Sequence, residues 1–324
     1  MAARVPCRRH RQRDEAWDRV VLPLVLAAAL DLLLCEPPLP LHPTRGIGAM
    51  LDRLATVVPA APRRAARARG ALMWATGLTV TSVAGIAVDR SLGRLPRTTA
   101  GIGRGIALWP LVSLRMLVDE VAAVETALGE DIDAGRATVA RLVSRDVGEL
   151  DRTRVREAAI SSLAENLVDA WVAPFAWFAV GGLPAAAAYR FINTADAMWG
   201  HRDARWRHAG TVAARADDLA NLLPARLCGV TLALPHVPLR SLYREADRTP
   251  SPNGGWPMAA VALRLGIRLS KPSTYVLHAV GRRARAADTA AAIRLVTGRA
   301  IGLVTAIAAL RVCGPAWRSR RCRR

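Results

Sequence analysis

The chain has almost no lysine. Lys271 is the single one, although Lys and Arg together number 46 against 26 Asp and Glu, for a net charge of +20. The basic charge is therefore almost all arginine, which is typical of a biased genomic base composition. The sequence also lacks a basic stripe interleaved with aromatic residues, the pattern typical of a nucleic-acid-binding surface. Because 52% of the residues are hydrophobic and cations flank the apolar runs, we expect membrane lipid as a partner and no nucleic acid.

Cysteine motifs and strand patterns are missing as well. The five cysteines are scattered without CxxC spacing, which implies neither a zinc site nor a disulfide framework. No useful strand-like alternation, repeat or low-complexity linker appears, so we predict an all-α fold in a single domain over 1–324. A basic N-terminus precedes an apolar run at 20–34, but no small-residue cleavage site follows. We interpret this run as a retained first membrane segment rather than a signal peptide.

Long uncharged runs are present. Residues 70–88 and 170–189 contain no charged side chain, and each is long enough to cross a bilayer, which takes about 20 apolar residues. The second run contains Gly181, Gly182 and Pro184, which predict a kinked or broken helix. Shorter apolar runs, interrupted or bounded by charges, occur at 20–34, 105–118, 227–239 and 300–310. We expect a polytopic cell-membrane protein with four to six membrane helices and polar connecting helices; its orientation stays open because both ends and several loops are basic.

A stripe of polar residues leads into the second uncharged run. Glu157, Ser161, Glu165 and Asp169 recur every four positions on a helix for which Asp151 is the expected N-cap. For Glu157 a solvated helix face is the better interpretation. Glu165 and Asp169 have strongly apolar neighbours, and two carboxylates one turn apart suit Mg²⁺ coordination or general acid–base catalysis.

Two oxygen-rich clusters lie between residues 193 and 226. The clusters consist of Asn193 and Asp196, then Asp217, Asp218 and Asn221, with guanidiniums nearby at Arg202, Arg215 and Arg226. Hard oxygen ligands beside planar donors are what a metal-bound phosphate needs, and the candidate metal ligands are Asp196, Asp217 and Asp218. For Asp203 and Arg207, a surface salt bridge is the better explanation.

Residues 250–257, PSPNGGWP, predict a tight, stiffened loop. A plain connector is the simpler interpretation, yet a loop that holds Asn253 and Trp256 before an apolar helix suits binding. Near the N-terminus, Asp31 and Glu36 are carboxylates at an apolar run and therefore functional candidates, whereas a lone His42 is more often structural.

The motifs together resemble one family, the membrane-bound adenosylcobinamide-phosphate synthases of cobalamin biosynthesis. The blocks that carry the resemblance are DLLLCEPPLPLHP (31–43), SRDVGELD (144–151), AENLVDAWVAP (164–174), NTADAMWGHRDARW (193–206), AARADDLANLLPARL (213–227) and PSPNGGWP (250–257). They occur in the family's order and lie within about 24–275, whereas the basic tails at 1–19 and 314–324 lie outside. Six blocks in order make the resemblance specific.

The resemblance implies an ATP-dependent ligase at the cell membrane. It would join the propionate carboxyl of adenosylcobyric acid, a corrinoid, to an aminoalcohol phosphate: (R)-1-amino-2-propanol O-phosphate or ethanolamine phosphate. ATP would be a co-substrate, with Mg²⁺ inferred from the phosphoryl chemistry. The candidate catalytic carboxylates are Glu165, Asp169, Asp196, Asp217 and Asp218. The candidate substrate-binding side chains are Asn166, Asn193, Arg202, Arg215, Asn221, Arg226, Asn253 and Trp256.

Several positions depart from the family pattern. Cys35-Glu36 stands where we expect Gly-Asp before the proline pair, His201 replaces an aromatic residue, and Met258 stands where glutamate is common. Two other functions remain open. A transporter of an anionic small molecule would also use intramembrane charges and a broken helix, although no equivalent halves are visible. A membrane prenyltransferase would need a further acid where this chain has Gly200.

Overall fold

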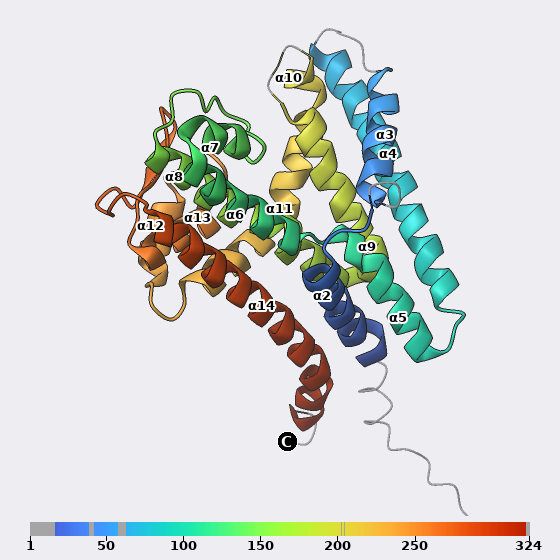
Figure 1. The fold of residues 1–324 in the computed structure, drawn as a ribbon. Coiled ribbons are helices and arrows are strands. Elements are labelled where there is room, and N and C mark those ends of the chain that lie inside the picture. The colour runs from blue at the N-terminus through green and yellow to red at the C-terminus, as the bar shows by residue number, and fades with distance from the viewer. Residues whose placement is uncertain (1–16, 39–41, 58–62, 202, 204, 322–324) are drawn as a thin grey trace, which may run out of the picture. The chain divides into compact units, whose positions relative to one another are not determined.

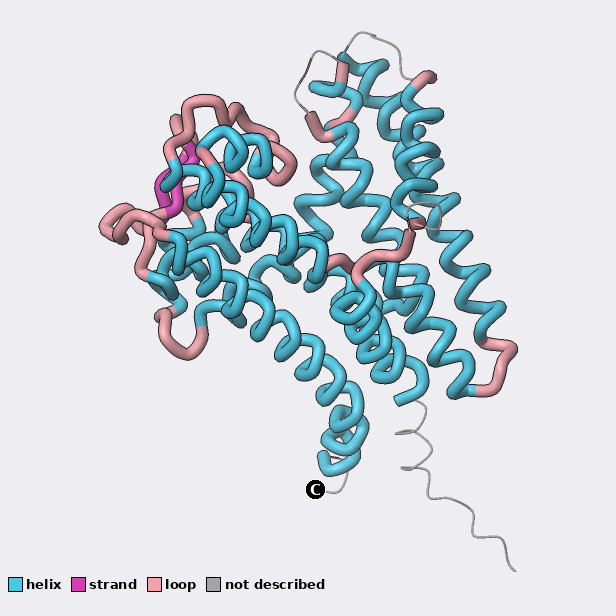
Figure 2. The backbone as a smooth tube through the Cα atoms, in the orientation of Figure 1, coloured by secondary structure: helices cyan, strands magenta, loops and turns pink. Residues whose placement is uncertain are grey.

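The computed structural model describes residues 17–38, 42–57, 63–201, 203 and 205–321, with side chains up to residue 311. The fold is 78% helical, which confirms the all-α class (Figure 2). One short antiparallel hairpin, β1 (Leu269–Lys271) with β2 (Tyr275–Leu277), was not anticipated, because three-residue strands are too short to give a visible alternation. By contact clustering the chain forms two compact units: Met1–Val112, Pro174–Asp217 and Gly302–Arg324, and then Ser113–Ala173 with Asp218–Ile301.

The first unit is a helical assembly labelled in Figure 1. Its elements are η1 (Trp17–Val21), α2 (Leu22–Leu34), α3 (Pro43–Ala55), α4 (Arg63–Leu92), α5 (Arg97–Leu108), η3 (Trp109–Leu111) and α10 (Trp206–Ala209), together with most of α9 (Ala173–Trp199). Helix α2 packs on α5, and α3 and α10 pack on α4. Small residues allow these approaches: a Cβ at Gly70 would lie 2.1 Å from the Ala209 carbonyl oxygen, and one at Gly77 would lie 2.5 Å from the Phe191 ring.

The second unit contains helices that pack around α8. Its elements are α6 (Leu114–Glu130), α7 (Ile132–Val139), α8 (Arg152–Leu167), the π-helical turn η4 (Val168–Val172), α12 (Leu239–Ala246), α13 (Gly255–Leu265), the hairpin, and parts of α11 (Thr211–Ala233) and α14 (Ala286–Arg321). Helices α6, α7 and α13 all pack on α8 (Figure 1). The expected N-cap is confirmed, because the Asp151 carboxylate accepts a hydrogen bond of 2.8 Å from the Arg154 amide.

Three of the described helices are long and apolar enough to cross a membrane. They span Arg63–Leu92, Arg152–Trp199 and Ala286–Arg311. The two uncharged runs predicted to span fall inside the first and second of these, and the run at 300–310 falls inside the third. The shorter run at 20–34 forms the 13-residue α2, preceded by η1. The predicted break in the second span is also confirmed, because Gly181 (φ −135°, ψ 18°) and Gly182 (φ 68°, ψ −158°) leave helical geometry.

Candidate active site

Two carboxylates lie where α8 changes its helical form. Glu165 belongs to the last turn of α8, and Asp169 lies in the π-helical turn η4 that follows. Turns of this kind are frequent at functional sites, because the extra residue changes the direction of a side chain. The Asp169 carboxylate accepts a 3.0 Å hydrogen bond from the side-chain amide of Asn221, which is only 3% exposed. The structure therefore joins two predicted site residues that lie 52 positions apart.

The loop before α13 is fixed against α11 by its asparagine. The Asn253 side chain donates to the Asp218 carbonyl oxygen at 2.8 Å and accepts from Arg226 at 3.1 Å. The Ser251 hydroxyl oxygen accepts from the backbone amides of Asn253 and Gly254, which closes the turn. The segment 250–254 is irregular, as predicted, whereas residue 255 already begins α13.

The Arg226 side chain contacts both Asn253 and Trp256. Its guanidinium lies 5.2 Å from the Trp256 ring centroid and also donates to the Leu222 carbonyl oxygen at 2.8 Å. The Trp256 backbone in turn packs against Gly229, where a Cβ would come within 2.9 Å of it. A guanidinium fixed over an aromatic ring presents its remaining N–H groups in a defined direction, which suits an anionic ligand.

Gly254 brings the loop directly to Glu165. A Cβ at this position would lie 2.5 Å from Oε1 of Glu165 and 3.1 Å from its carboxyl carbon. Any larger residue at this position would require the Glu165 side chain to move. The blocks at 164–174, 213–227 and 250–257 therefore meet around one pair of carboxylates.

Sequence reasoning missed the basic and phenolic groups around Glu165. Glu165 interacts electrostatically with Asp169, Lys271 and Arg145, and Tyr275 lies within range of its charge. Burial lowers the pKa of the Arg145 guanidinium, while burial together with the charge of Glu165 raises the pKa of the Tyr275 phenol. Two signals could have found this region: Lys271 is the only lysine of the chain, and Arg145 lies in the block 144–151 that carries the resemblance.

The interpretation of Glu157 as a solvated residue is wrong. Its side chain is fully buried, with Arg268 Nε at 3.8 Å and a hydrogen bond donated by the Ser270 hydroxyl. A buried carboxylate needs such partners, and here they come from the hairpin region. Asn166, on the same helix, donates to the Ser162 hydroxyl at 2.9 Å, so its amide is engaged within α8.

In the first unit, Asn193 donates to the Asp217 carboxylate at 3.3 Å, so two more predicted residues meet. Asp196 lies near the end of α9, where its carboxylate folds against Gly200: a Cβ there would be 2.0 Å from Oδ1. Arg215 is exposed on α11. Arg202 lies outside the described residues.

The predicted surface pair of Asp203 and Arg207 is wrong. The Asp203 carboxylate instead accepts from the backbone amides of Arg205 at 2.9 Å and Trp206 at 2.8 Å, where it caps the short helix α10. Capping satisfies backbone amides that have no partner within the helix, so it competes effectively with an exposed ion pair. His42 is structural, as expected, because its Nδ1 accepts from the Thr44 amide at the start of α3.

Over the described residues, no group of three His, Cys, Asp or Glu side chains could hold a metal ion. Asp217 and Asp218 are adjacent on one helix, so their side chains point about 100° apart. A dedicated protein cage for Mg²⁺ needs more ligands than these described residues supply, whereas a Mg²⁺ already bound to a ligand's phosphate needs only one or two protein carboxylates.

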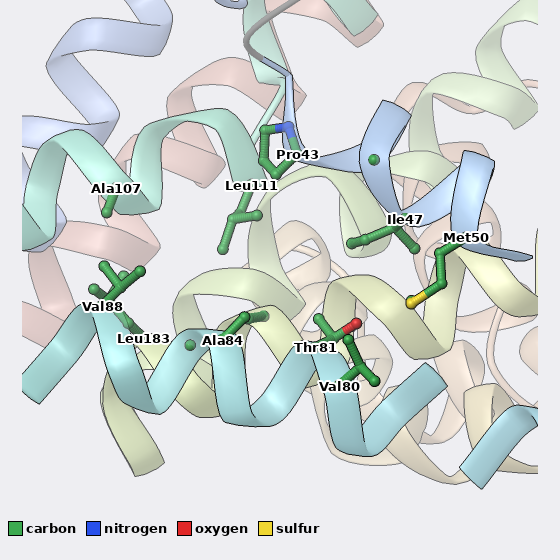
Figure 3. Close-up of a pocket in the computed structure, with 13 residues that line it drawn as sticks. Pro43, Ile47, Met50, Val80, Thr81, Ala84, Val88, Ala107, Leu111 and Leu183 are labelled. Atoms are coloured by element: carbon green, nitrogen blue, oxygen red, sulfur yellow. The ribbon is translucent and has the colours of Figure 1, made fainter. Parts of the chain in front are cut away.

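An apolar cavity of about 360 Å³ lies in the first unit among α3, α4, α9 and the end of α5. Figure 3 shows Ile47 and Met50 of α3 facing Val80, Thr81 and Ala84 of α4 across it. Thr81 is the only lining side chain with a polar atom. This cavity offers no acid, base or charged ligand for chemistry.

These features define an all-α membrane protein with carboxylates, amides and guanidiniums gathered at the ends of its apolar helices. The chain belongs to the CobD/Cbib protein family, whose model matches residues 24–301. It is 41% identical over 263 residues to a cobalamin biosynthesis protein CobD of Rhodobacter capsulatus, covering 78% of this chain and 82% of that protein.

Two further relatives cover more of the chain. A cobalamin biosynthesis protein CobD of Brucella suis is 38% identical over 303 residues, which cover 84% of this chain and 91% of the relative. A probable cobalamin biosynthesis protein CobD of Pyrococcus abyssi is 37% identical over 298 residues, with 90% and 97% covered. No solved structure matches the chain.

Proposed function

We propose that this protein is an adenosylcobinamide-phosphate synthase. It would form an amide between the propionate carboxyl of adenosylcobyric acid and the amine of an aminoalcohol phosphate, with ATP as co-substrate, at the cell membrane. The relatives' names support a role in cobalamin biosynthesis. The observation that carries the proposal is the meeting of Asp169, Asn221, Glu165 and Gly254, which come from three separate sequence blocks.

Amide formation from a carboxylate requires that one carboxylate oxygen leave. ATP makes this oxygen a leaving group by transferring a phosphoryl group to it. The attacking amine must first lose a proton from its ammonium form. Glu165 and Asp169 are the carboxylates that would accept that proton. In balance, a P–O bond of ATP breaks as a carboxylate oxygen bonds to the transferred phosphorus, and the amine then forms the C–N bond as the C–O bond breaks; the oxygen leaves on phosphate and the amine proton is released.

The anionic substrates need cationic partners. Arg226 has a fixed orientation over Trp256 and is the first candidate for a phosphate or carboxylate contact. Mg²⁺ bound to ATP would neutralise phosphoryl charge, and the candidate carboxylates for a contact with it are Glu165 and Asp169 or Asp196 and Asp217. The apolar helices would hold the corrinoid and its product at the membrane, in contact with lipid.

The test is ATP consumption by the purified protein in detergent. We expect turnover only when corrinoid and aminoalcohol phosphate are both present. Asp169→Asn and Asp196→Asn should each abolish ligation while the protein stays folded, and Asp133→Asn should not, because the Asp133 carboxylate is 83% exposed on α7. Near-normal turnover of Asp196→Asn would remove that residue from the site.

Anion transport is the second candidate, favoured by the broken helix at Gly181 and Gly182. Flux of a labelled anion in proteoliposomes, without ATP turnover, would replace the ligase proposal with this one.

A further inference from the structure

A second cavity, in the second unit, shares Lys271 and Tyr275 with the surroundings of Glu165. Its volume is about 450 Å³, and its walls come from the start of α8, the segment before β1, and the hairpin β1–β2. Three of its lining residues are cationic, Arg154, Arg268 and Lys271, and no carboxylate lines it. The cavity is within the size range of small-molecule sites.

Glu157 neutralises the positive charge of the cavity only in part. The nearest carboxylate beneath it is the buried Glu157, 3.8 Å from Arg268 Nε, a distance that gives an ion pair without a hydrogen bond. Arg268 Nε is therefore a buried donor that no acceptor satisfies in the described part of the chain. Glu157 Oε1, which it faces, also lacks a hydrogen bond, so the pair neutralises Arg268 only in part, and the Arg268 side chain stays 30% exposed where it lines the cavity.

The wall that carries Lys271 is a defined structure. The Thr274 amide donates to the Lys271 carbonyl oxygen at 3.0 Å, which closes the turn, and Ser273 sits at φ 57°. Arg145 donates to the Ser270 carbonyl oxygen at 3.2 Å, and the Tyr275 hydroxyl contacts Met258 of α13 at 3.3 Å. Both strands are thus fixed to neighbouring elements. Ser273 has a positive φ, and residues in such strained conformations cluster at ligand sites.

Two residues that line the cavity also interact with Glu165. They are Lys271 and Tyr275, and both are within electrostatic range of Glu165. Lys271 would therefore be shared between an anionic ligand in the cavity and the Glu165 carboxylate.

We propose that this hairpin cavity binds a phosphate group, with Arg154, Arg268 and Lys271 as its cationic contacts. The guanidiniums match phosphate oxygens in pairs, and the lysine contributes a point charge. A phosphate monoester or a nucleotide polyphosphate carries this chemistry. The choice between these two ligands rests on the proposed function; the binding of phosphate does not.

The experiment measures binding to the purified full-length protein in detergent by calorimetry. The probes are ethanolamine phosphate, ATP, inorganic phosphate and, as the uncharged-end control, ethanolamine. Lys271→Gln and Arg154→Gln should each weaken a phosphate probe by about tenfold or more, since each removes a charge-assisted contact. Lys271→Arg should keep most of the affinity. Arg240→Gln, an exposed change on α12, is the matched control.

The outcomes separate the sources of the phosphate. Loss confined to ethanolamine phosphate assigns the cavity to the amine substrate, and loss confined to ATP assigns it to the nucleotide. Unchanged affinity for all three phosphate probes in folded Lys271→Gln and Arg154→Gln protein would overturn the inference. If phosphate binding depends on Lys271 but the wild-type protein ligates nothing, the inference stands and the proposed function fails. If the protein ligates but the Lys271 and Arg154 variants bind phosphate as tightly as wild type, the inference fails and the proposed function stands.

Discussion

A single methyl group at residue 254 tests the geometry of the site. In Gly254→Ala the new Cβ would lie 2.5 Å from Oε1 of Glu165, 3.1 Å from its carboxyl carbon and 3.4 Å from Cγ. The obstacle is the end of a flexible side chain, so Glu165 can move away. We expect the free energy of unfolding to fall by only about 1–3 kcal/mol, the usual cost of one extra buried methyl group.

The effect on turnover should be much larger than the effect on stability. Relief of the clash displaces the Glu165 carboxylate by a distance on the order of 1 Å, and a misplacement of that size can lower a rate about 100-fold. The assay is steady-state ATP consumption with both other substrates, together with a thermal unfolding curve in the same detergent. Gly129→Ala on α6 is the matched control, because no atom lies within 4 Å of its added Cβ.

Glu165→Asp in the Gly254→Ala background shortens the side chain that clashes. It should recover stability without restoring full turnover, since the carboxylate stays displaced. Wild-type turnover in Gly254→Ala, with the control also unchanged, would refute the placement of the loop against Glu165.

Three other predictions concern single contacts. Asn221→Leu removes the donor to Asp169 and should lower turnover at least about tenfold, which steady-state kinetics would show; an unchanged rate would exclude a positioning role for Asn221. Asp151→Ala removes the N-cap of α8 and should cost about 1 kcal/mol in the free energy of unfolding, with turnover per folded molecule unchanged. Burial lowers the pKa of His42 below 6.5, despite the opposing charge of Glu36 and with a smaller contribution from Arg190. The unfolded state then binds the proton first, so stability should fall as the pH drops below 6.5, and His42→Asn should flatten this part of a pH–stability profile.

The sequence predicted the features that depend on local chemistry. These features depend only on residues close in sequence, and the structure contains all three: long apolar helices at the uncharged runs, the N-cap at Asp151, and the break at Gly181 and Gly182. Asp169 and Asn221 were also predicted as site residues, and the structure brings these two side chains together. That they bond to each other depends on how distant helices pack, which no local pattern contains.

The features that were missed depend on long-range partners. Glu157 looked solvated because its pattern matches a polar helix face, yet its side chain is buried, and the Ser270 hydroxyl, 113 positions away, donates a hydrogen bond to one of its two oxygens. Asp203 was assigned to Arg207 by spacing, whereas the backbone amides at the start of α10 compete for it. The hairpin that carries Lys271 has strands of three residues, below the length at which alternation is visible.

The central claim is that this protein couples ATP consumption to amide formation between a corrinoid carboxylate and an aminoalcohol phosphate. The most direct test follows ATP and product in one reaction with purified protein in detergent, and omits each substrate in turn. The account predicts ATP loss and corrinoid amide in equal amounts with all three substrates present, and neither when any one is missing. ATP loss that needs no corrinoid, or anion flux across proteoliposomes with no ATP loss, would contradict it.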